Sequence, residues 1–95
     1  MTEPGAKHDE GKHMMRLLPW ASLKCVVRVL EFGMVKYTEG GWRHVKDGKQ
    51  RYLDAGLRHV ADYLEGEEND PESGLHHIWH AATDFLFAIH FLGEQ

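Results

Sequence analysis

Apolar residues recur at helical spacing in three separate stretches of this chain. From Trp20 to about Tyr37 they follow one another at intervals of three and four, as on one face of a helix: Leu23, Val26, Val27, Leu30 and Met34. From about Arg51 to Leu64 the pattern returns with Leu53, Gly56, Leu57, Val60 and Leu64. A third stretch runs from Gly74 to about Leu92. The pattern therefore predicts three main helices.

The segments between these stretches lack any helical or strand period. Residues 1–16 are polar and contain glycine, so we expect an arm there, with Pro19 in the first turn of the first helix. Residues 38–50 and the sequence GEENDPESG predict loops, and Ser73 is a candidate cap for the third helix.

The absence of strand signals completes the picture of the fold. Val26-Val27 is the only β-branched pair that the pattern singles out, and it stands inside a helical period. We therefore expect an all-α fold, a small helical bundle of three main helices plus an N-terminal arm. Residues 1–16 form the arm and 17–95 a single domain.

Length and charge narrow the class of protein. A chain of 95 residues buries only about 60% of its unfolded surface, so its core is small and oligomerisation would complete it. A net charge of −4 gives no electrostatic reason to expect a nucleic-acid polymer as ligand. The lone Cys25 cannot form an internal disulfide. No signal-like start is present, and the longest apolar run falls short of the roughly 20 residues that span a bilayer. We expect a cytoplasmic protein without a membrane partner.

Eight histidines are unusual in so short a chain, and histidine is the commonest metal ligand. In the third helix His77, His80 and Asp84 fall within an arc of about 60° beside an apolar stripe. This helix is apolar nearly all round, so we expect it to be covered on both sides. Ionisable groups in such a setting need partners, which could be metal ions, a bound ligand, backbone carbonyls or one another.

The other two helices bring matching groups to the edge of their apolar faces. Arg58, His59 and Asp62 lie at spacings of three and four, where side chains touch; a surface salt bridge between Arg58 and Asp62 is the alternative. Glu31 lies at the edge of the first helix's stripe, where it could also extend into solvent. Helical bundles build metal sites in this way. Oxygen-rich ligands favour Mg²⁺ or Mn²⁺, and a histidine-rich set could also hold Zn²⁺, Fe or Co.

Positive charges suited to phosphate stand near glycines, aromatic rings or the candidate ligands: Lys7, Lys12, Lys36, Arg43 and Arg58. Lys36-Tyr37 and Trp42-Arg43 each pair a cation with a ring, a combination that can hold a phosphate and stack a base. Either pair could equally be ordinary packing. No Walker-type phosphate loop, Rossmann glycine pattern or HExxH motif is present in the sequence.

The order of motifs resembles a known family. KHDEGK is followed by LLP, FGMVKY, Trp42, LRH and finally GEENDPESGLHHIWHA. From about Lys7 to Leu92 this order is similar to the dATP/dGTP diphosphohydrolase family of phages and bacteria, which is related to the MazG-like all-alpha NTP pyrophosphatases. DPESGLHHIWHA is its most specific part.

The resemblance implies a metal-dependent enzyme that cleaves dGTP or dATP to monophosphate and pyrophosphate with Mg²⁺ or Mn²⁺. It implies a homodimer or homotetramer in the cytoplasm of a bacterium or phage-infected host. Its implied metal ligands are Glu31, His59, Asp62, His80 and Asp84. Glu72 and Asp84 are the implied catalytic residues, with Glu72 as ligand or water-activating base. The substrate would be bound by Lys12, Lys36 and Arg58 at the triphosphate and by Tyr37 or Trp42 at the base.

One departure from the MazG-like pattern keeps alternatives open. RHVAD occupies the place of a glutamate-rich EExxE motif, so His59 and Asp62 stand where glutamates are expected. A non-catalytic protein that binds or sequesters a nucleotide is the first alternative. The second is a metal phosphohydrolase of the HD type, which also uses histidine and aspartate on helices.

Overall fold

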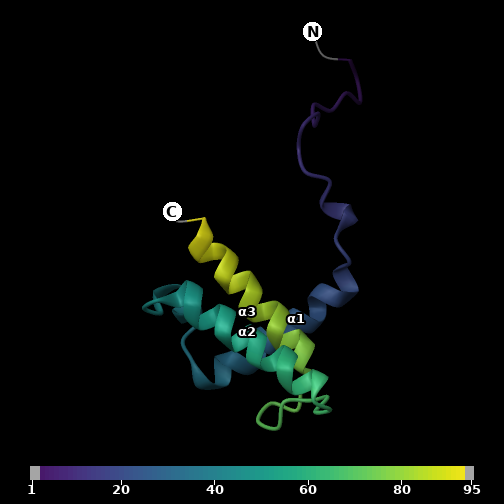
Figure 1. The fold of residues 1–95 in the computed structure, drawn as a ribbon. Coiled ribbons are helices and arrows are strands. Elements are labelled where there is room, and N and C mark those ends of the chain that lie inside the picture. The colour runs from purple at the N-terminus through teal and green to yellow at the C-terminus, as the bar shows by residue number, and fades with distance from the viewer. Residues whose placement is uncertain (1–2, 94–95) are drawn as a thin grey trace.

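The computed structural model describes residues 3–93, and these residues form an all-helical fold (Figure 1). Its elements are two short 3₁₀ helices and three long α-helices, in the order η1 (Met15–Leu17), α1 (Trp20–Lys36), η2 (Gly41–His44), α2 (Gly48–Leu64) and α3 (His77–Leu92). The described residues contain one isolated β-bridge, between Asn69 and His76, and no strand. The predicted all-α architecture with three main helices is confirmed.

Helices α2 and α3 form the closely packed pair of the fold. Gly48 and Gly56 of α2 are buried because aromatic rings of α3 lie directly against their backbone. A Cβ atom on Gly56 would lie 2.5 Å from Cε1 of Phe85. A Cβ atom on Gly48 would lie even closer to Cζ of Phe91. Side chains at these positions would separate the two helices. The glycines therefore fix the distance at which α2 and α3 cross.

Helix α1 packs against α3 through a narrower face than the sequence predicts. It buries Val26 and Val29, whereas Val27, Leu30 and Met34 of the predicted stripe are 48%, 40% and 55% exposed. The periodicity was right about the helix and about Val26, but it missed Val29 and wrongly placed Val27, Leu30 and Met34 on the inner face. Because α1 packs against α3 alone among the helices of residues 3–93, only a small part of its apolar surface is covered.

The covering of α3 also differs from the prediction. Its inward side is fully buried at His77, Ala81 and Ala88, but Leu86 and Ile89 on its outer side are 47% and 59% exposed. The expectation that α3 is covered on both sides is therefore wrong for one chain by itself. Among the described elements, α1, α2 and the short η2 pack against it, and together they leave its outer side open.

Two helix boundaries differ from the sequence prediction. Helix α2 begins at Gly48 rather than at Arg51, and η2 lies within the segment predicted as loop. Helix α3 begins at His77 rather than at Gly74, with His76 as its cap in place of Ser73. The cause is the loop before α3, in which the backbone N–H of His77 donates to the Glu68 carbonyl and holds the chain outside the helix.

The residues before α1 extend away from the three helices (Figure 1). Residues 3–14 contain turns but no helix, and they are exposed. Residues 1–2 of the predicted arm and 94–95 of the predicted domain lie outside the described residues. The boundary at residue 16 stays a prediction. No helix in the described part of the chain is long and apolar enough to cross a membrane.

Candidate functional site

A large cleft opens between the end of α1, η2, the inner face of α2, α3 and the loop that joins α2 to α3. Its volume is about 1190 Å³. Every site residue predicted from the sequence lines it except Lys12 and Asp62: Glu31, Lys36, Tyr37, Trp42, Arg58, His59, Glu72, His80 and Asp84. Segments that are far apart in the sequence therefore meet at one site. The roles assigned to these residues stay predictions.

One wall of the cleft is a cluster of histidines from α2 and α3. The His59 and His80 rings stack with their centroids 4.7 Å apart and an angle of 14° between their planes. On the other side of His59, its Nδ1 lies 2.8 Å from Nδ1 of His77. Nε2 of His80 lies 2.6 Å from the Ser73 hydroxyl. Each ring is thus held by its neighbours in a fixed orientation.

His59 and His80 are weaker bases than a histidine in water. Burial lowers the pKa of His59 and of His80 below the ordinary value of 6.5, and the neighbouring rings lower both further. Both rings are therefore neutral at neutral pH. A neutral imidazole has a free lone pair on one nitrogen, which is the form that binds a metal ion.

Asp84 lies beside this cluster on α3. Its Oδ2 is 3.9 Å from Nε2 of His59. Burial raises the pKa of the Asp84 carboxyl to about 7, although the Arg58 guanidinium acts in the opposite direction. A carboxyl group that titrates near neutral pH can both donate and accept a proton under working conditions, which is the property of a general acid or base.

Asp70 approaches the same cluster from the loop between α2 and α3. Its Oδ2 accepts a hydrogen bond of 2.9 Å from the Ser73 backbone N–H. Burial acts to raise the pKa of Asp70, but the hydrogen bonds from Ser73, together with the electrostatic effect of His80 and His59, outweigh it and the pKa is lowered. Asp70 is therefore ionised at neutral pH and faces the histidines as a negative charge.

The cleft also carries an ion pair between two predicted site residues. Nζ of Lys36, at the end of α1, contacts Oε1 of Glu72 on the α2–α3 loop. The hydrogen bonds with Glu72 and with Tyr37 raise the pKa of Lys36. Lys36 also lies 5.2 Å from the centre of the Tyr37 ring. A cation and an exposed ring are thus presented together, as the sequence suggested.

Trp42 has a packing role that the sequence left open. Its ring stacks on Phe87 of α3 with centroids 4.3 Å apart, and the Arg43 guanidinium lies 4.6 Å over it. It also meets the rings of His90 and Phe91 edge to face. Trp42 therefore anchors η2 to α3, and Tyr37 is the more accessible of the two predicted base contacts.

Two predicted site residues lie outside the cleft lining. Lys12 belongs to the exposed segment before η1. Asp62 is exposed on α2 and is grouped instead with Glu67 and His77. The sequence pattern placed Asp62 on the same arc as His59, but α2 turns only its His59 edge toward α3.

The set of metal ligands implied by the resemblance contains none of His77, Asp70 and Glu67, although Asp70 and His77 were candidates for further ligands from the DPESGLHHIWHA segment. Two sets of potential ligands in the described part of the chain have ligand atoms within 4.8 Å of one another: His59, Asp70 and His77, and Asp62, Glu67 and His77. The described residues thus offer groups that could hold a divalent ion. The presence of His77 in the arc with His80 and Asp84 was the available signal in the sequence.

Comparison with known proteins identifies relatives of the chain. The family described as dATP/dGTP diphosphohydrolase, N-terminal, matches residues 2–95. A dATP/dGTP diphosphohydrolase of Salmonella phage PMBT28 is 36% identical over 91 residues. That match covers 96% of this chain and 31% of the phage protein, so the chain spans less than a third of the length of that relative. No solved structure matches.

The match of the family extends over helices, loops and cleft alike, including the DPESGLHHIWHA segment that supplies Asp70, Glu72, His77 and His80. On this evidence the chain belongs to the N-terminal domain family of the dATP/dGTP diphosphohydrolases.

Proposed function

We propose that this domain binds a purine deoxynucleoside triphosphate in the cleft and hydrolyses it to the monophosphate and pyrophosphate, with divalent metal ions. One observation carries the proposal: a single cleft brings together cations, an exposed aromatic ring and a wall of neutral histidines beside a carboxyl group that titrates near pH 7. The name of the phage relative supports the same reaction. The MazG-like relationship and a cytoplasmic location belong to this proposal.

The cationic side of the cleft suits the triphosphate. Lys36 and Arg58 supply positive charge from α1 and α2, and Tyr37 supplies the ring for the base. A phosphate group that binds Lys36 competes with Glu72 for the ammonium group. The Glu72 carboxylate is then released from its ion pair and can accept a proton from an attacking water.

The histidines and carboxyl groups of the cleft suit a divalent ion. His59 and His80 offer neutral ring nitrogens, while Glu31 and Asp84 offer carboxyl oxygens from α1 and α3. This mixed set fits Mn²⁺ at least as well as Mg²⁺. When bound, such an ion polarises a phosphate oxygen and lowers the pKa of water. Arg58 keeps Asp84 partly ionised, so the carboxyl can serve as ligand or exchange a proton.

Turnover assays test the reaction directly. The protein is incubated with each dNTP and with Mg²⁺, Mn²⁺ or Co²⁺, and the products are separated. Release of pyrophosphate from dGTP or dATP is expected. Asp84→Ala should abolish it with little change in helical circular dichroism, whereas Asp54→Ala, at an exposed carboxyl in the same cleft, should retain most of it.

A non-catalytic nucleotide-binding protein is the second candidate. The observation that favours it is the scarcity of ionised carboxylates on the histidine wall, since the Asp84 pKa is raised to about 7. Tight binding of a dNTP without pyrophosphate release under any metal ion would select this function. Release of inorganic phosphate or triphosphate would instead select chemistry of the HD type.

Self-association is part of the proposed function. All three helices leave large apolar side chains at least 38% exposed in the single chain, among them Leu30, Met34, Val35, Leu57, Leu64, Ile78, Leu86 and Ile89. So much exposed apolar surface is typical of an interface. We expect a homodimer or homotetramer, which sedimentation velocity or light scattering would measure. A monodisperse monomer at 100 µM, which is roughly the concentration range of such assays, would contradict it.

A further inference from the structure

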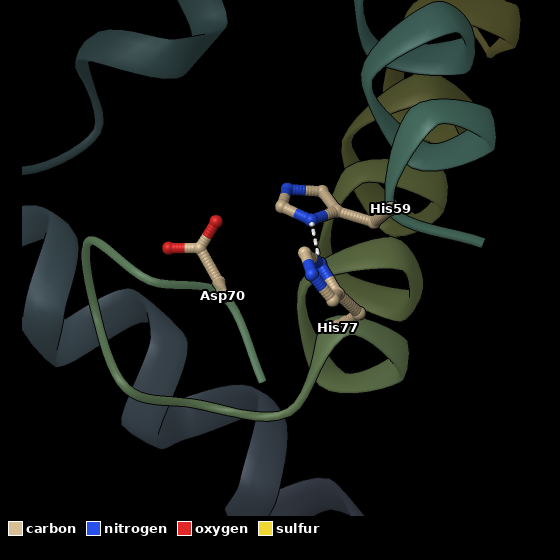
Figure 2. Close-up of side chains that lie close together, drawn as sticks. All are labelled: His59, Asp70 and His77. Atoms are coloured by element: carbon tan, nitrogen blue, oxygen red, sulfur yellow. Dashed lines mark hydrogen bonds between the residues drawn. The ribbon is translucent and has the colours of Figure 1, made fainter. Parts of the chain in front are cut away.

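Three potential metal ligands converge where α2, α3 and the loop between them meet. His59 comes from α2, Asp70 from the loop and His77 from the first turn of α3. One ligand atom from each lies within 4.8 Å of the others. Figure 2 shows the two imidazole rings facing each other, with the Asp70 carboxylate across from them. The proposed hydrolase site uses His59 but neither Asp70 nor His77.

The first step concerns His77, whose ring is the most deeply buried large side chain of the fold, at 1% exposure. Its Nε2 lies 2.6 Å from Oε1 of Glu67. A carboxylate can only accept, so Nε2 carries the proton and donates it to Glu67. Nδ1 of His77 is then left with its lone pair. A carboxylate that orients a histidine from its far nitrogen is the usual support of a metal-bound imidazole.

The second step concerns the nitrogen that this lone pair faces. Nδ1 of His77 lies 2.8 Å from Nδ1 of His59, so His59 donates its Nδ1 proton to His77 when no ion is bound. Binding of an ion between the two rings requires that proton to leave Nδ1 of His59. It can be taken up by Nε2 of the same ring, which faces Asp84 at 3.9 Å, so the charge of the ring is unchanged.

Asp70 completes the set with a negative oxygen ligand. The Ser73 backbone N–H holds the Asp70 carboxylate through Oδ2, which restricts its orientation. Two imidazole nitrogens and one carboxylate oxygen are a ligand set of transition-metal ions such as Zn²⁺ and Fe²⁺. Mg²⁺ prefers oxygen ligands almost exclusively.

We propose that His59, Asp70 and His77 bind one divalent transition-metal ion of the zinc class, with Glu67 as the positioning residue behind His77. The site shares His59 with the ion proposed for hydrolysis, and an ion on Nδ1 of His59 leaves Nε2 of that ring protonated, so His59 then serves this ion alone. A metal-binding titration reads this site without reference to nucleotide hydrolysis. His59 and Asp70 line the cleft, whereas His77 is buried behind them. The open coordination positions of the ion therefore face the cleft, where a water or a phosphate oxygen can bind.

A second potential set shares His77 but is the weaker site. Asp62 and Glu67 are exposed, and they lie on the Nε2 side of the ring. That nitrogen already carries the proton that it donates to Glu67 in a hydrogen bond. Using it would break the 2.6 Å hydrogen bond that orients His77. The cleft-side set uses the nitrogen that is free to bind.

Metal titration without nucleotide tests the site. The chain is freed of metal with EDTA and dialysed, then titrated with Co²⁺ as the probe, followed by visible absorption, and with Zn²⁺ by calorimetry. One ion per chain is expected, and millimolar Mg²⁺ should not displace it. Absence of binding to the wild-type chain, or displacement by Mg²⁺, would overturn the proposal.

Variants locate the ion. Asp70→Asn removes a ligand and Glu67→Gln removes the orienting carboxylate, and each should weaken binding about 10- to 100-fold. Both residues are at least partly exposed, so the fold should persist, as circular dichroism would check. His44→Ala, at an exposed histidine of η2, is the matched control and should bind as the wild type does. Equal affinity in Asp70→Asn and His44→Ala would refute this assignment, whatever the turnover assays show.

Discussion

Replacement of Asp84 by asparagine should make the protein more stable at neutral pH, although the residue belongs to the proposed active site. Asparagine has nearly the same shape as aspartate and carries no charge. The folded chain holds the Asp84 carboxyl mostly buried, and this raises its pKa from 3.8 to about 7. The unfolded chain leaves the same group in water. Ionisation of Asp84 therefore favours the unfolded state.

The size and the pH range of the effect follow from the two pKa values. Between pH 3.8 and 7 the Asp84 carboxyl binds more protons in the folded state than in the unfolded state. The contribution of Asp84 to the free energy of unfolding therefore falls as the pH rises through this window and is constant above it. The full difference corresponds to about 4 kcal/mol, at 1.36 kcal/mol per pKa unit. Because the side chain keeps 16% exposure, we expect about 2 to 3 kcal/mol.

Urea unfolding followed by circular dichroism measures this difference. Wild type and Asp84→Asn are compared from pH 4 to pH 8 in EDTA, which removes bound metal. The variant should be more stable above pH 7, and the difference should disappear near pH 4. Asp54→Asn, at an exposed carboxyl of the same cleft, should change stability by less than about 0.5 kcal/mol. A difference for Asp84→Asn that is zero at pH 8, or independent of pH, would refute the reasoning.

The remaining predictions concern the cleft and the crossing of the helices. Lys36→Ala should raise KM for a dNTP about tenfold, since a phosphate contact to a charged group contributes about 1.5 kcal/mol. Lys24→Ala, on the same helix, should leave KM unchanged, and equal KM values in the two variants would remove Lys36 from the site. Gly56→Ala should destabilise the protein by about 1 to 3 kcal/mol in urea, because its Cβ would meet an aromatic ring of α3. Gly33→Ala has open space around it and should be neutral or stabilising, so a similar loss in both variants would contradict the close packing. Burial lowers the pKa of His80, so protonation of this ring opposes folding below pH 6.5. His80→Gln should therefore lose less stability on acidification than the wild type. An unchanged slope of stability against pH would speak against a buried neutral ring.

The aromatic and histidine side chains of α3 show how far the sequence could locate the site. A helical period fixes the angle at which each residue leaves its own helix, so His77, His80 and Asp84 were predicted to share one arc. The same reasoning placed His59 beside the apolar edge of α2. These angles selected His59, His80 and Asp84, which line the cleft, and also Asp62, which does not.

What the period could not supply is the rotation of one helix against another. The predicted stripe of α1 includes Met34, which is 55% exposed. Contact with α3 buries Val26, a member of that stripe, and Val29, which the stripe did not include. Gly56 was predicted as one member of an apolar stripe, but its lack of a side chain is what allows the Phe85 ring of α3 to lie against α2.

The sequence by itself therefore determined the number of helices, their approximate limits and the residue types that could carry chemistry, because these depend on local periodicity. Only the tertiary structure decided that Nδ1 of His59 and of His77 face each other at 2.8 Å, and that burial raises the pKa of Asp84. It also decided that Asp70 joins them from a loop with no period of its own. Distances between helices and the loss of solvent arise only when the elements pack, and no pattern within one segment contains them.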